Sequence, residues 1–183
     1  MEFQRKILGD TIRNDAFHQA LKKVIVPGQS TVADLGSGTG FLSFLASKLG
    51  AKECYLYEFT DAFFLSKKLA AANGIKNCHF LHKHSAEVKN PVKVDVVVSE
   101  TLGNFALEEN ILETLRDAKR FLKPGGVMLP QRLKQFVAPV IGDRLFQDIN
   151  IWDRVGYGLD LSLAREASLQ NMYVKTLKPD ELL

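Results

Sequence analysis

The stretch Val32-Ala33-Asp34-Leu35-Gly36-Ser37-Gly38-Thr39-Gly40 decides the fold of this chain. The residues Thr31–Ala33 are apolar or β-branched and predict a buried strand, and residues 41–49 predict a helix with a wide apolar face. Closely spaced glycines between a strand and a helix permit a tight turn, and they let a ligand approach backbone N–H groups at the positive end of the helix. This layout is typical of a nucleotide-type site in an α/β sheet.

Asp34, at the end of that strand, narrows the choice of ligand. The glycine spacing is Gly-x-Gly-x-Gly, and Phe41 stands where the dinucleotide fingerprint has its third glycine. A carboxylate beside the loop repels a pyrophosphate but attracts an ammonium group. S-adenosylmethionine carries an ammonium and a sulfonium and has no phosphate, so electrostatics favours it over NAD. A dinucleotide site and a glycine turn without a ligand are the alternatives.

Length and composition predict one ordinary globular domain with a sizeable core. The chain has 183 residues, of which 46% are hydrophobic and 25% charged, and its formal net charge of +3 is too small to favour nucleic acid as a partner. Cys54 and Cys78 predict neither a disulfide framework nor a metal cluster, which fits a reducing compartment. Without a charged-then-apolar leader or a membrane-length apolar run, we expect a soluble, cytoplasmic protein that does not bind membranes.

Strand and helix patterns alternate along the chain. Their order predicts a doubly wound, mostly parallel α/β sheet, with domain boundaries at 1–142 for the ligand-binding part and 143–183 for a C-terminal extension. The periodicity weakens after residue 143, where 146–152 could form a helix. The expected helices are 9–25, 41–49, 61–73 and 109–122; the expected strands are 31–33, 52–58, 77–81, 92–99, 127–130 and 135–140, with a turn at 123–126.

Polar residues follow several of these strands at the edge where parallel sheets hold ligands. Glu58 comes 24 positions after Asp34, near the interval at which an acid meets ribose hydroxyls, although it could instead cap the next helix. The loop 82–87 lies where the third strand of such a fold meets adenine. Its two histidines, with His79 nearby, lack a cysteine or carboxylate at a ligand spacing, so no metal is expected.

Several motifs together resemble those of class I S-adenosylmethionine-dependent methyltransferases, and in particular the protein arginine methyltransferase family. The most specific is Ser99-Glu100-Thr101-Leu102-Gly103 followed by Glu109, which resembles the double-glutamate loop that grips a substrate guanidinium. The stretches 122–132 and 155–162 are similar to later segments of that family. The resemblance runs over most of residues 9–183 and implies a Rossmann-like methyltransferase fold.

Carried over by position, the resemblance implies an S-adenosylmethionine site and a separate acceptor site. Glu100 and Glu109 would be the catalytic acids, although Glu109 could simply begin a helix. The acceptor would be a protein or small molecule with a cationic nitrogen. The implied cofactor-binding residues are Arg13, Asp34, Gly36, Ser37, Gly38, Gly40, Glu58, Ser85 and Ala86; the family usually has a glutamate where Ala86 stands, so a backbone contact is expected there.

This sequence departs from the family's pattern in two places. The family's N-terminal helix, with its paired aromatic residues, has no counterpart before Phe3, and residues 177–183 fall about where its β-barrel begins. That barrel carries a threonine-histidine-tryptophan loop and a dimerisation arm, so the sequence leaves open a homodimer and a longer parent chain. The competing functions are a methyltransferase for another acceptor, a non-catalytic cofactor-binding scaffold and a nicotinamide-dependent oxidoreductase.

Overall fold

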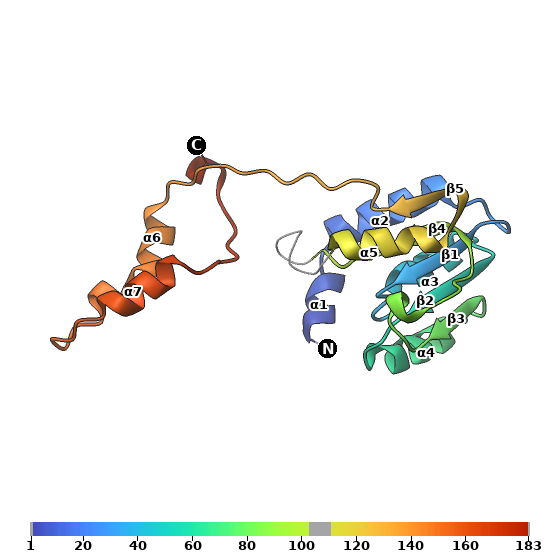
Figure 1. The fold of residues 1–183 in the computed structure, drawn as a ribbon, viewed down its shortest axis with the longest axis horizontal. Coiled ribbons are helices and arrows are strands. Elements are labelled where there is room, and N and C mark those ends of the chain that lie inside the picture. Colours follow the sequence, from blue (N-terminus) through green and yellow to red (C-terminus); the bar gives the residue numbers. More distant parts are fainter. Residues whose placement is uncertain (1, 103–110, 183) are drawn as a thin grey trace. The chain divides into compact units, whose positions relative to one another are not determined.

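The computed structural model describes residues 2–102 and 111–182. The chain divides into two compact units, which we call the sheet unit (residues 1–133) and the C-terminal unit (residues 134–183). Figure 1 shows the sheet unit with its strands and flanking helices, and the C-terminal unit with α6 and α7. Each unit is described by itself below.

A parallel sheet organises the sheet unit. Its strands are ordered β3-β2-β1-β4-β5, and every described pair of neighbours is parallel. The order changes direction between β1 and β4, so their carboxyl ends flank the crevice where doubly wound sheets bind ligands. The predicted α/β fold is confirmed. The strands are β1 Thr31–Leu35, β2 Glu53–Tyr57, β3 Cys78–Leu81, β4 Val94–Val98 and β5 Leu122–Leu129.

Helices cover both faces of this sheet, as the run of apolar residues in its central strands requires. On one face α2 and α3 pack on a cluster that includes Leu21, Leu42 and Val96; on the other, α5 and the turn after it bring Phe121 against the fully buried Val97. The helices of this unit are α1 Glu2–Leu8, α2 Thr11–Val24, α3 Phe41–Lys48, α4 Ala62–Ala72 and α5 Ile111–Ala118.

Two of these helices shape the approach to the glycine turn. Asp10 caps α2 by accepting a hydrogen bond from the Arg13 backbone N–H at 2.9 Å, which fixes the start of the predicted lead-in helix. The sequence analysis assigns no element before residue 9, but the structure has α1 there. The Gln4 side chain of α1 lies against Gly38, within 2.9 Å of where a Cβ on that glycine would stand.

Two sequence predictions near β5 are wrong. The stretch 123–126, predicted as a turn, lies inside β5, where the pairing jumps from Val94↔Leu122 to Val96↔Val127 and the extra residues form a bulge. The predicted strand 135–140 does not form: apart from one antiparallel bridge at Val140, that segment has no strand partner among the described residues. Apolar residues there satisfied the strand pattern without a neighbouring strand to pair with.

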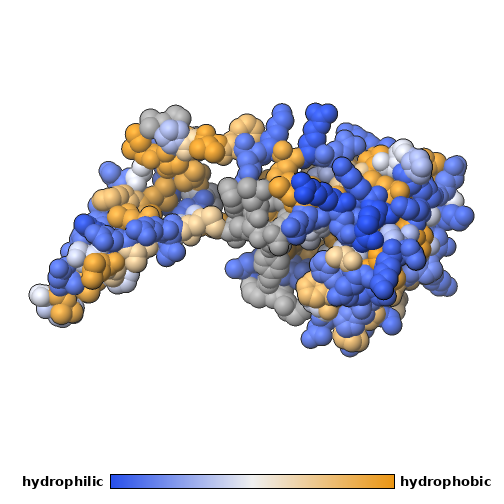
Figure 2. All heavy atoms as spheres, in the orientation of Figure 1, coloured by the Kyte–Doolittle hydropathy of each residue, from blue (hydrophilic) through white to orange (hydrophobic). Residues whose placement is uncertain are grey.

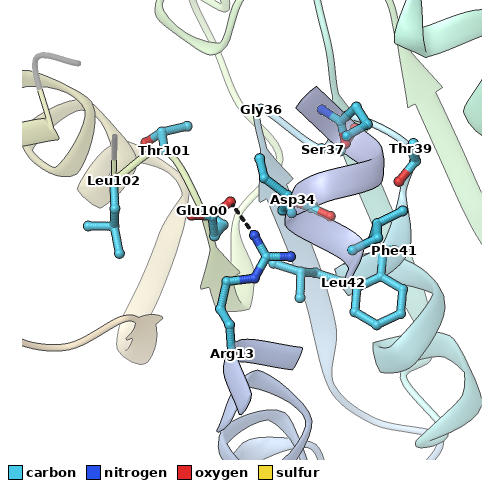
Figure 3. A pocket seen from close by; sticks show the side chains of 14 residues that line it. Arg13, Asp34, Gly36, Ser37, Thr39, Phe41, Leu42, Glu100, Thr101 and Leu102 are labelled. Atoms are coloured by element: carbon cyan, nitrogen blue, oxygen red, sulfur yellow. Dashed lines mark hydrogen bonds and ion pairs between the residues drawn. The ribbon is translucent and has the colours of Figure 1, made fainter. Parts of the chain in front are cut away.

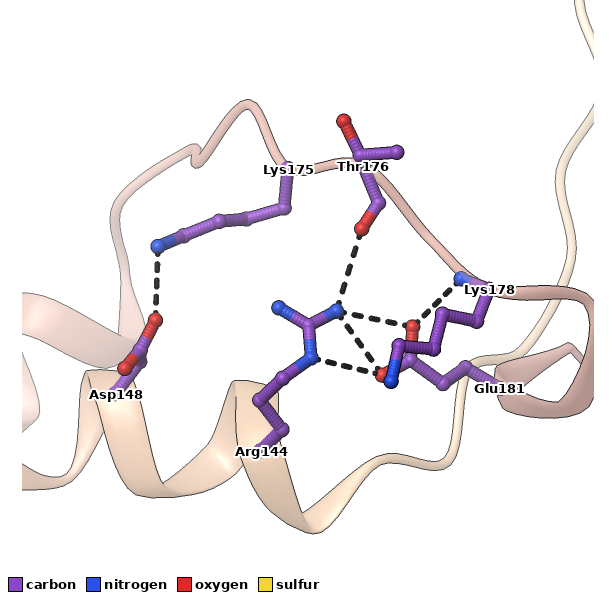
Figure 4. Close-up of polar contacts among 6 residues, drawn as sticks. All are labelled: Arg144, Asp148, Lys175, Thr176, Lys178 and Glu181. Carbon is purple, nitrogen blue, oxygen red and sulfur yellow. Dashed lines mark hydrogen bonds and ion pairs between the residues drawn. The ribbon is translucent and has the colours of Figure 1, made fainter.

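The C-terminal unit contains α6 Asp143–Ile149, α7 Ser162–Leu169 and two short 3-10 helices, Ile151–Arg154 and Pro179–Glu181. Within the described residues of this unit, no apolar residue is buried. Figure 2 shows many hydrophobic residues on its surface. Polar contacts connect its segments instead, among them the ion pair between Arg144 and Glu181 drawn in Figure 4. No helix in the described part of the whole chain is both long and apolar enough to cross a membrane.

Candidate active site

Two hollows lie at the carboxyl edge of the sheet, on either side of the glycine turn. Gly36 and Thr101 line both, and the Thr101 methyl group lies 3.1 Å from where a Gly36 Cβ would stand. The volumes are about 90 Å³ and 200 Å³. Each alone is below the roughly 300 Å³ of typical ligand pockets, and Gly36 and Thr101 form the boundary that the two hollows share.

The first hollow gathers most of the predicted cofactor residues and Glu100 (Figure 3). They come from the amino end of α2, the β1 turn and the end of β4, with α1 contributing three lining residues that the sequence analysis missed. The apolar pair at Ile7 and Leu8 was the available signal for that helix. The lining residues are Gln4, Ile7, Leu8, Arg13, Asp34, Gly36, Ser37, Gly38, Thr39, Phe41, Leu42, Glu100, Thr101 and Leu102.

The glycine turn needs its glycines for conformational reasons. Gly36, Gly38 and Gly40 have φ angles of 75°, 53° and 85°, in the left-handed region that other residues rarely adopt. Gly40 begins α3, and a Cβ there would lie 2.5 Å from the Phe44 ring. The Gly36 N–H donates to Tyr57 O at 2.9 Å, so the turn is also attached to the end of β2.

Asp34 lies at the floor of the first hollow with a side chain that is almost wholly buried. Its Oδ2 accepts hydrogen bonds from the Ser43 N–H at 3.1 Å and the Ser43 hydroxyl at 2.8 Å; Oδ1 takes part in neither. Burial dominates and raises the pKa of Asp34 from 3.8 to about 7, despite the Ser43 hydrogen bonds that lower it. A cationic ligand group beside Asp34 would favour its ionised form.

Arg13 and Glu100 form an ion pair across the first hollow. The Arg13 Nη1 donates to Glu100 Oε2 at 2.9 Å, and both side chains are about one-fifth exposed. Arg13 also donates from Nη2 to Asn14 Oδ1 at 3.0 Å. Figure 3 shows the Arg13 side chain extending from α2 towards Glu100. The structure therefore brings a predicted cofactor residue directly against a predicted acceptor residue.

Two polar atoms at the first hollow lack hydrogen-bond partners. Among the described residues, the Ser37 Oγ and the Arg13 Nε are buried and unpaired. Buried polar groups are nearly always hydrogen-bonded, so such atoms in a hollow favour a polar ligand. Together with the buried carboxylate of Asp34, they suit a ligand that carries both an ammonium group and a carboxylate.

Glu58 is buried behind the glycine turn and lines neither hollow in the described part of the chain. Its Oε2 accepts from the Gly38 N–H at 2.7 Å, and its Oε1 accepts from the Thr60 N–H at 2.7 Å. Glu58 thus ties the turn to the segment that precedes α4. The expected ribose contact and the alternative of a helix-entry role are compatible, because each oxygen retains a further lone pair.

The second hollow is lined by the ends of β1 and β2 and by the loop after β3. The Phe59 and His84 rings have centroids 5.4 Å apart, and sequence reasoning missed them as lining residues. Ser85 is buried and lines the hollow, whereas the Ala86 N–H donates to His84 Nδ1 at 3.2 Å and Ala86 is not a lining residue. The lining residues are Leu35, Gly36, Tyr57, Phe59, Lys83, His84, Ser85, Thr101 and Thr114.

The other histidines near β3 have partners of their own. His79 pairs with Glu53 and stacks on Tyr55, and His82 stacks on Phe63 with ring centroids 4.5 Å apart. The second predicted acceptor acid, Glu109, lies outside the described residues. The structure therefore describes only the Glu100 side of the predicted acid pair.

Comparisons with known proteins also identify this chain as similar to methyltransferases. A family profile described as "Methyltransferase domain" matches residues 28–154. Protein arginine N-methyltransferase 1 of Dictyostelium discoideum is 32% identical over 185 residues, covering 97% of this chain and 53% of that protein. A probable protein arginine N-methyltransferase 6 of Arabidopsis thaliana is 30% identical over 187 residues, covering 97% of this chain and 42% of that protein.

A solved structure is similar as well. The PRMT1 enzyme–prozyme heterotetrameric complex of Trypanosoma brucei, described with AdoHcy, matches with a TM-score of 0.89 and 25% identity, covering 98% of this chain and 58% of that one. The chain thus spans about half the length of the curated relatives that it matches.

Proposed function

Because this chain belongs to the methyltransferase-domain family, we propose that it transfers the methyl group of S-adenosylmethionine to a cationic nitrogen of the arginine type. One observation carries the proposal. The buried Asp34 carboxylate, the Arg13 guanidinium and the Glu100 carboxylate converge on one hollow beside a glycine turn. An amino-acid-like ligand group and a cation would each find an opposite charge there.

The cofactor residues divide between the two hollows. Asp34 would attract the ammonium group of the methionine end, and Arg13 its carboxylate, with the Ser37 hydroxyl available as a further partner. Across the Gly36–Thr101 boundary, Phe59 and His84 offer aromatic faces to a flat base, with Ser85 beside them. Glu58 would accept from the ribose hydroxyls, and the Ala86 backbone would meet the adenine.

The same charges disfavour a nicotinamide dinucleotide. A pyrophosphate at the glycine turn would lie near Asp34, Glu58 and Glu100. Burial is the main cause that raises the pKa of Asp34, and repulsion by the other two acids raises it further, so more negative charge there is unfavourable. AdoHcy, the group described in the Trypanosoma brucei complex, is a sulfur compound without a phosphate. This supports S-adenosylmethionine as the cofactor.

Glu100 would hold the acceptor. When bound, the cofactor supplies an electrophilic methyl group on a positively charged sulfur. Glu100 would accept parallel hydrogen bonds from the acceptor guanidinium, with Glu109 expected as its counterpart. The chain's task is then to orient a nitrogen lone pair towards the methyl carbon, so positioning and electrostatics supply most of the rate.

Protein arginines are the acceptors that the names of the relatives imply, and we carry them to this chain as part of the proposal. A small cationic acceptor is the nearest alternative. A homodimer fits the proposal, as does a heteromeric assembly like the one named for the Trypanosoma brucei protein. Two free cysteines agree with a reducing compartment such as the cytoplasm.

Two measurements test the proposal. Calorimetry should detect binding of S-adenosylhomocysteine and none of NAD. In a tritiated-methyl assay over arginine peptides and small amines, Glu100→Gln should lower turnover by roughly a hundredfold or more, the scale of losing one electrostatic stabiliser. Its affinity for S-adenosylhomocysteine should be retained, or rise modestly because Arg13 loses its charged partner.

Glu113→Gln is the matched control, since this exposed acid of α5 lines neither hollow. Its turnover should equal that of the unaltered chain. Cofactor binding without transfer to any acceptor would mean that the chain is a binding scaffold, and full activity of Glu100→Gln would rule out the acid-held acceptor.

A further inference from the structure

The chain has two cysteines, and the fold sets them opposite one another. Cys54 of β2 and Cys78 of β3 are register partners in the parallel sheet, and the Cys54 N–H donates to Asn77 O at 2.8 Å. Register partners on adjacent parallel strands point to the same face. Neighbouring strands lie about 4.8 Å apart, inside the roughly 4.4–6.8 Å between Cα atoms that a disulfide requires.

The two thiols have different surroundings. Cys54 is fully buried in the core beneath α3, and its thiol donates to Ser43 O at 3.6 Å; Cys78 is partly exposed, on a strand at one end of the described sheet. The neighbouring Cys54 thiol lowers the pKa of the Cys78 thiol, whereas Cys78 and burial raise the pKa of Cys54. Cys78 is therefore the sulfur that a reagent in water meets first, and the one with more thiolate character.

We propose that Cys54 and Cys78 form an oxidative modification site, in which hydrogen peroxide converts the two thiols into a disulfide that joins β2 to β3. The Cys78 thiolate attacks one oxygen of the peroxide, the O–O bond breaks, and Cys78 becomes a sulfenic acid while the other oxygen leaves as water after taking up a proton. The Cys54 sulfur then attacks the Cys78 sulfur, and the sulfenic hydroxyl leaves with the Cys54 proton as a second water.

The sheet has the freedom that this second step needs. Among the described strands β3 is bonded only to β2, so it can move the small distance that brings two sulfurs into bonding contact without breaking a second ladder. The core beneath Cys54 stays in place, because β2 is held between β1 and β3. A thiol reducing agent reverses the change by exchange at either sulfur.

The test uses the full chain, treated with hydrogen peroxide, alkylated with N-ethylmaleimide under denaturing conditions and measured by intact mass and peptide mapping. We expect the oxidised chain to take up no maleimide at either cysteine, and its mass to be lower than that of the untreated chain by two hydrogen atoms. Dithiothreitol should restore both thiols and the original mass. Before oxidation, native Cys78 should react with the maleimide roughly tenfold or more faster than buried Cys54, since buried cysteines are inert.

The single variants separate the steps. Cys54→Ser should stop at a Cys78 sulfenic acid that dimedone traps, and Cys78→Ser should resist oxidation as long as circular dichroism shows that it is folded. The order of maleimide labelling in the unaltered chain needs no variant at all. Accumulation of Cys78 sulfinic acid without a disulfide, a bridge between two chains, or equal labelling of both native thiols would overturn the proposal.

Discussion

The sheet unit and the C-terminal unit keep their shapes by different means. Every buried apolar residue of the described chain lies in the sheet unit, whereas the one buried residue of the C-terminal unit is charged, Glu181. Glu181 accepts from the Arg144 guanidinium at 3.0 Å and from the Lys178 N–H at 2.7 Å (Figure 4). Apolar burial is the larger source of stability, so the sheet unit should be the robust part of the chain.

The two units also differ in how their carboxyl groups respond to pH, since only the sheet unit contains, among the described residues, an acid with a raised pKa; its Asp95 has a pKa lowered by hydrogen bonds from Thr31 and Lys123. In the sheet unit, burial raises the pKa of Asp34 to about 7. In the C-terminal unit the pKa values of three acids are lowered: that of Asp148 by the Lys175 hydrogen bond, that of Asp160 by the Ser162 N–H, and that of Glu181 by the Lys178 N–H. Acids therefore connect segments in both units, and Asp34 differs from them because it is buried at a hollow with a raised pKa.

The largest expected contrast comes from matched phenylalanines. Phe121 is fully buried and Phe146 is 54% exposed. Phe121→Ala should lower the free energy of unfolding by about 3–5 kcal/mol, the range for large-to-small changes in a core, whereas Phe146→Ala should change it by about 0.5 kcal/mol or less. Urea titrations followed by circular dichroism measure both. Equal losses would mean that the C-terminal unit has a core of its own.

Next in size is the pH response of Asp34. A carboxyl group with a raised pKa in the folded state favours folding most below its ordinary value of 3.8, and that contribution is lost as the pH rises to about 7. The loss should be on the order of a few kcal/mol. Hydrogen exchange of the sheet amides, corrected for intrinsic rates, should reveal it between these pH values.

Asp34→Asn supplies the control, because it keeps the shape and removes the titration. In that variant the sheet should lose this pH dependence. The C-terminal unit should respond the other way in both proteins, opening more readily as the pH falls below the ordinary 4.5 of Glu181, whose pKa is lowered on folding. A C-terminal unit that gains protection in acid would contradict the role of its acids in connecting its segments.

A smaller effect distinguishes two buried glutamates, one in each unit. Glu58 and Glu181 are 5% and 7% exposed. Glu58→Ala should weaken binding of S-adenosylhomocysteine at least tenfold, since charge-assisted hydrogen bonds contribute about 1.5–3 kcal/mol. Glu181→Ala should leave that affinity unchanged. Calorimetry measures the affinity of the unaltered chain and of both variants for S-adenosylhomocysteine. If all three affinities are equal, Glu58 does not belong to the cofactor site.

The smallest expected change is local. Arg144→Gln removes the ion pair to Glu181 and the hydrogen bond to Thr176 O at 3.2 Å. Amides of residues 141–149 and 176–182 should then exchange faster, while those of the sheet keep their rates. Mass-spectrometric hydrogen exchange resolves the two sets of amides. Faster exchange in the sheet, with unchanged rates in residues 141–149 and 176–182, would contradict this expectation.

The sheet could be predicted from the sequence because its signals are local and agree with each other. The run Val94–Val98, the glycine turn and the acids at strand ends each specify one element or edge. Asp34 is predicted from its own position, and Arg13 and Glu100 are predicted through the resemblance. That the three line one hollow depends on the strand order, in which β4 lies beside β1. That Phe59 and His84 line the second hollow depends on their side-chain positions, which the hydrophobic periodicity of the sequence does not predict.

The bulge in β5 and the boundary between the units could not be predicted, because they depend on strand register and on exposure. The bulge at 123–126 reads as a turn because Pro124 and Gly125 favour turns wherever they stand, and only the register with β4 shows that the strand continues through them. The units divide at residue 133, and the sequence analysis places its boundary at 142. Apolar residues such as Phe136 and Val137 look like a strand until their exposure is known.

The Arg13–Glu100 ion pair has a consequence for how strongly two ligands bind together. While the two side chains neutralise each other at 2.9 Å, neither is free to meet a ligand at full charge. A carboxylate that captures Arg13 releases Glu100 as an anion, and a cation that then binds Glu100 no longer competes with Arg13. By thermodynamic linkage each ligand should strengthen the other's binding by the same factor. The pair should therefore make binding of the two ligands cooperative, whichever of them binds first.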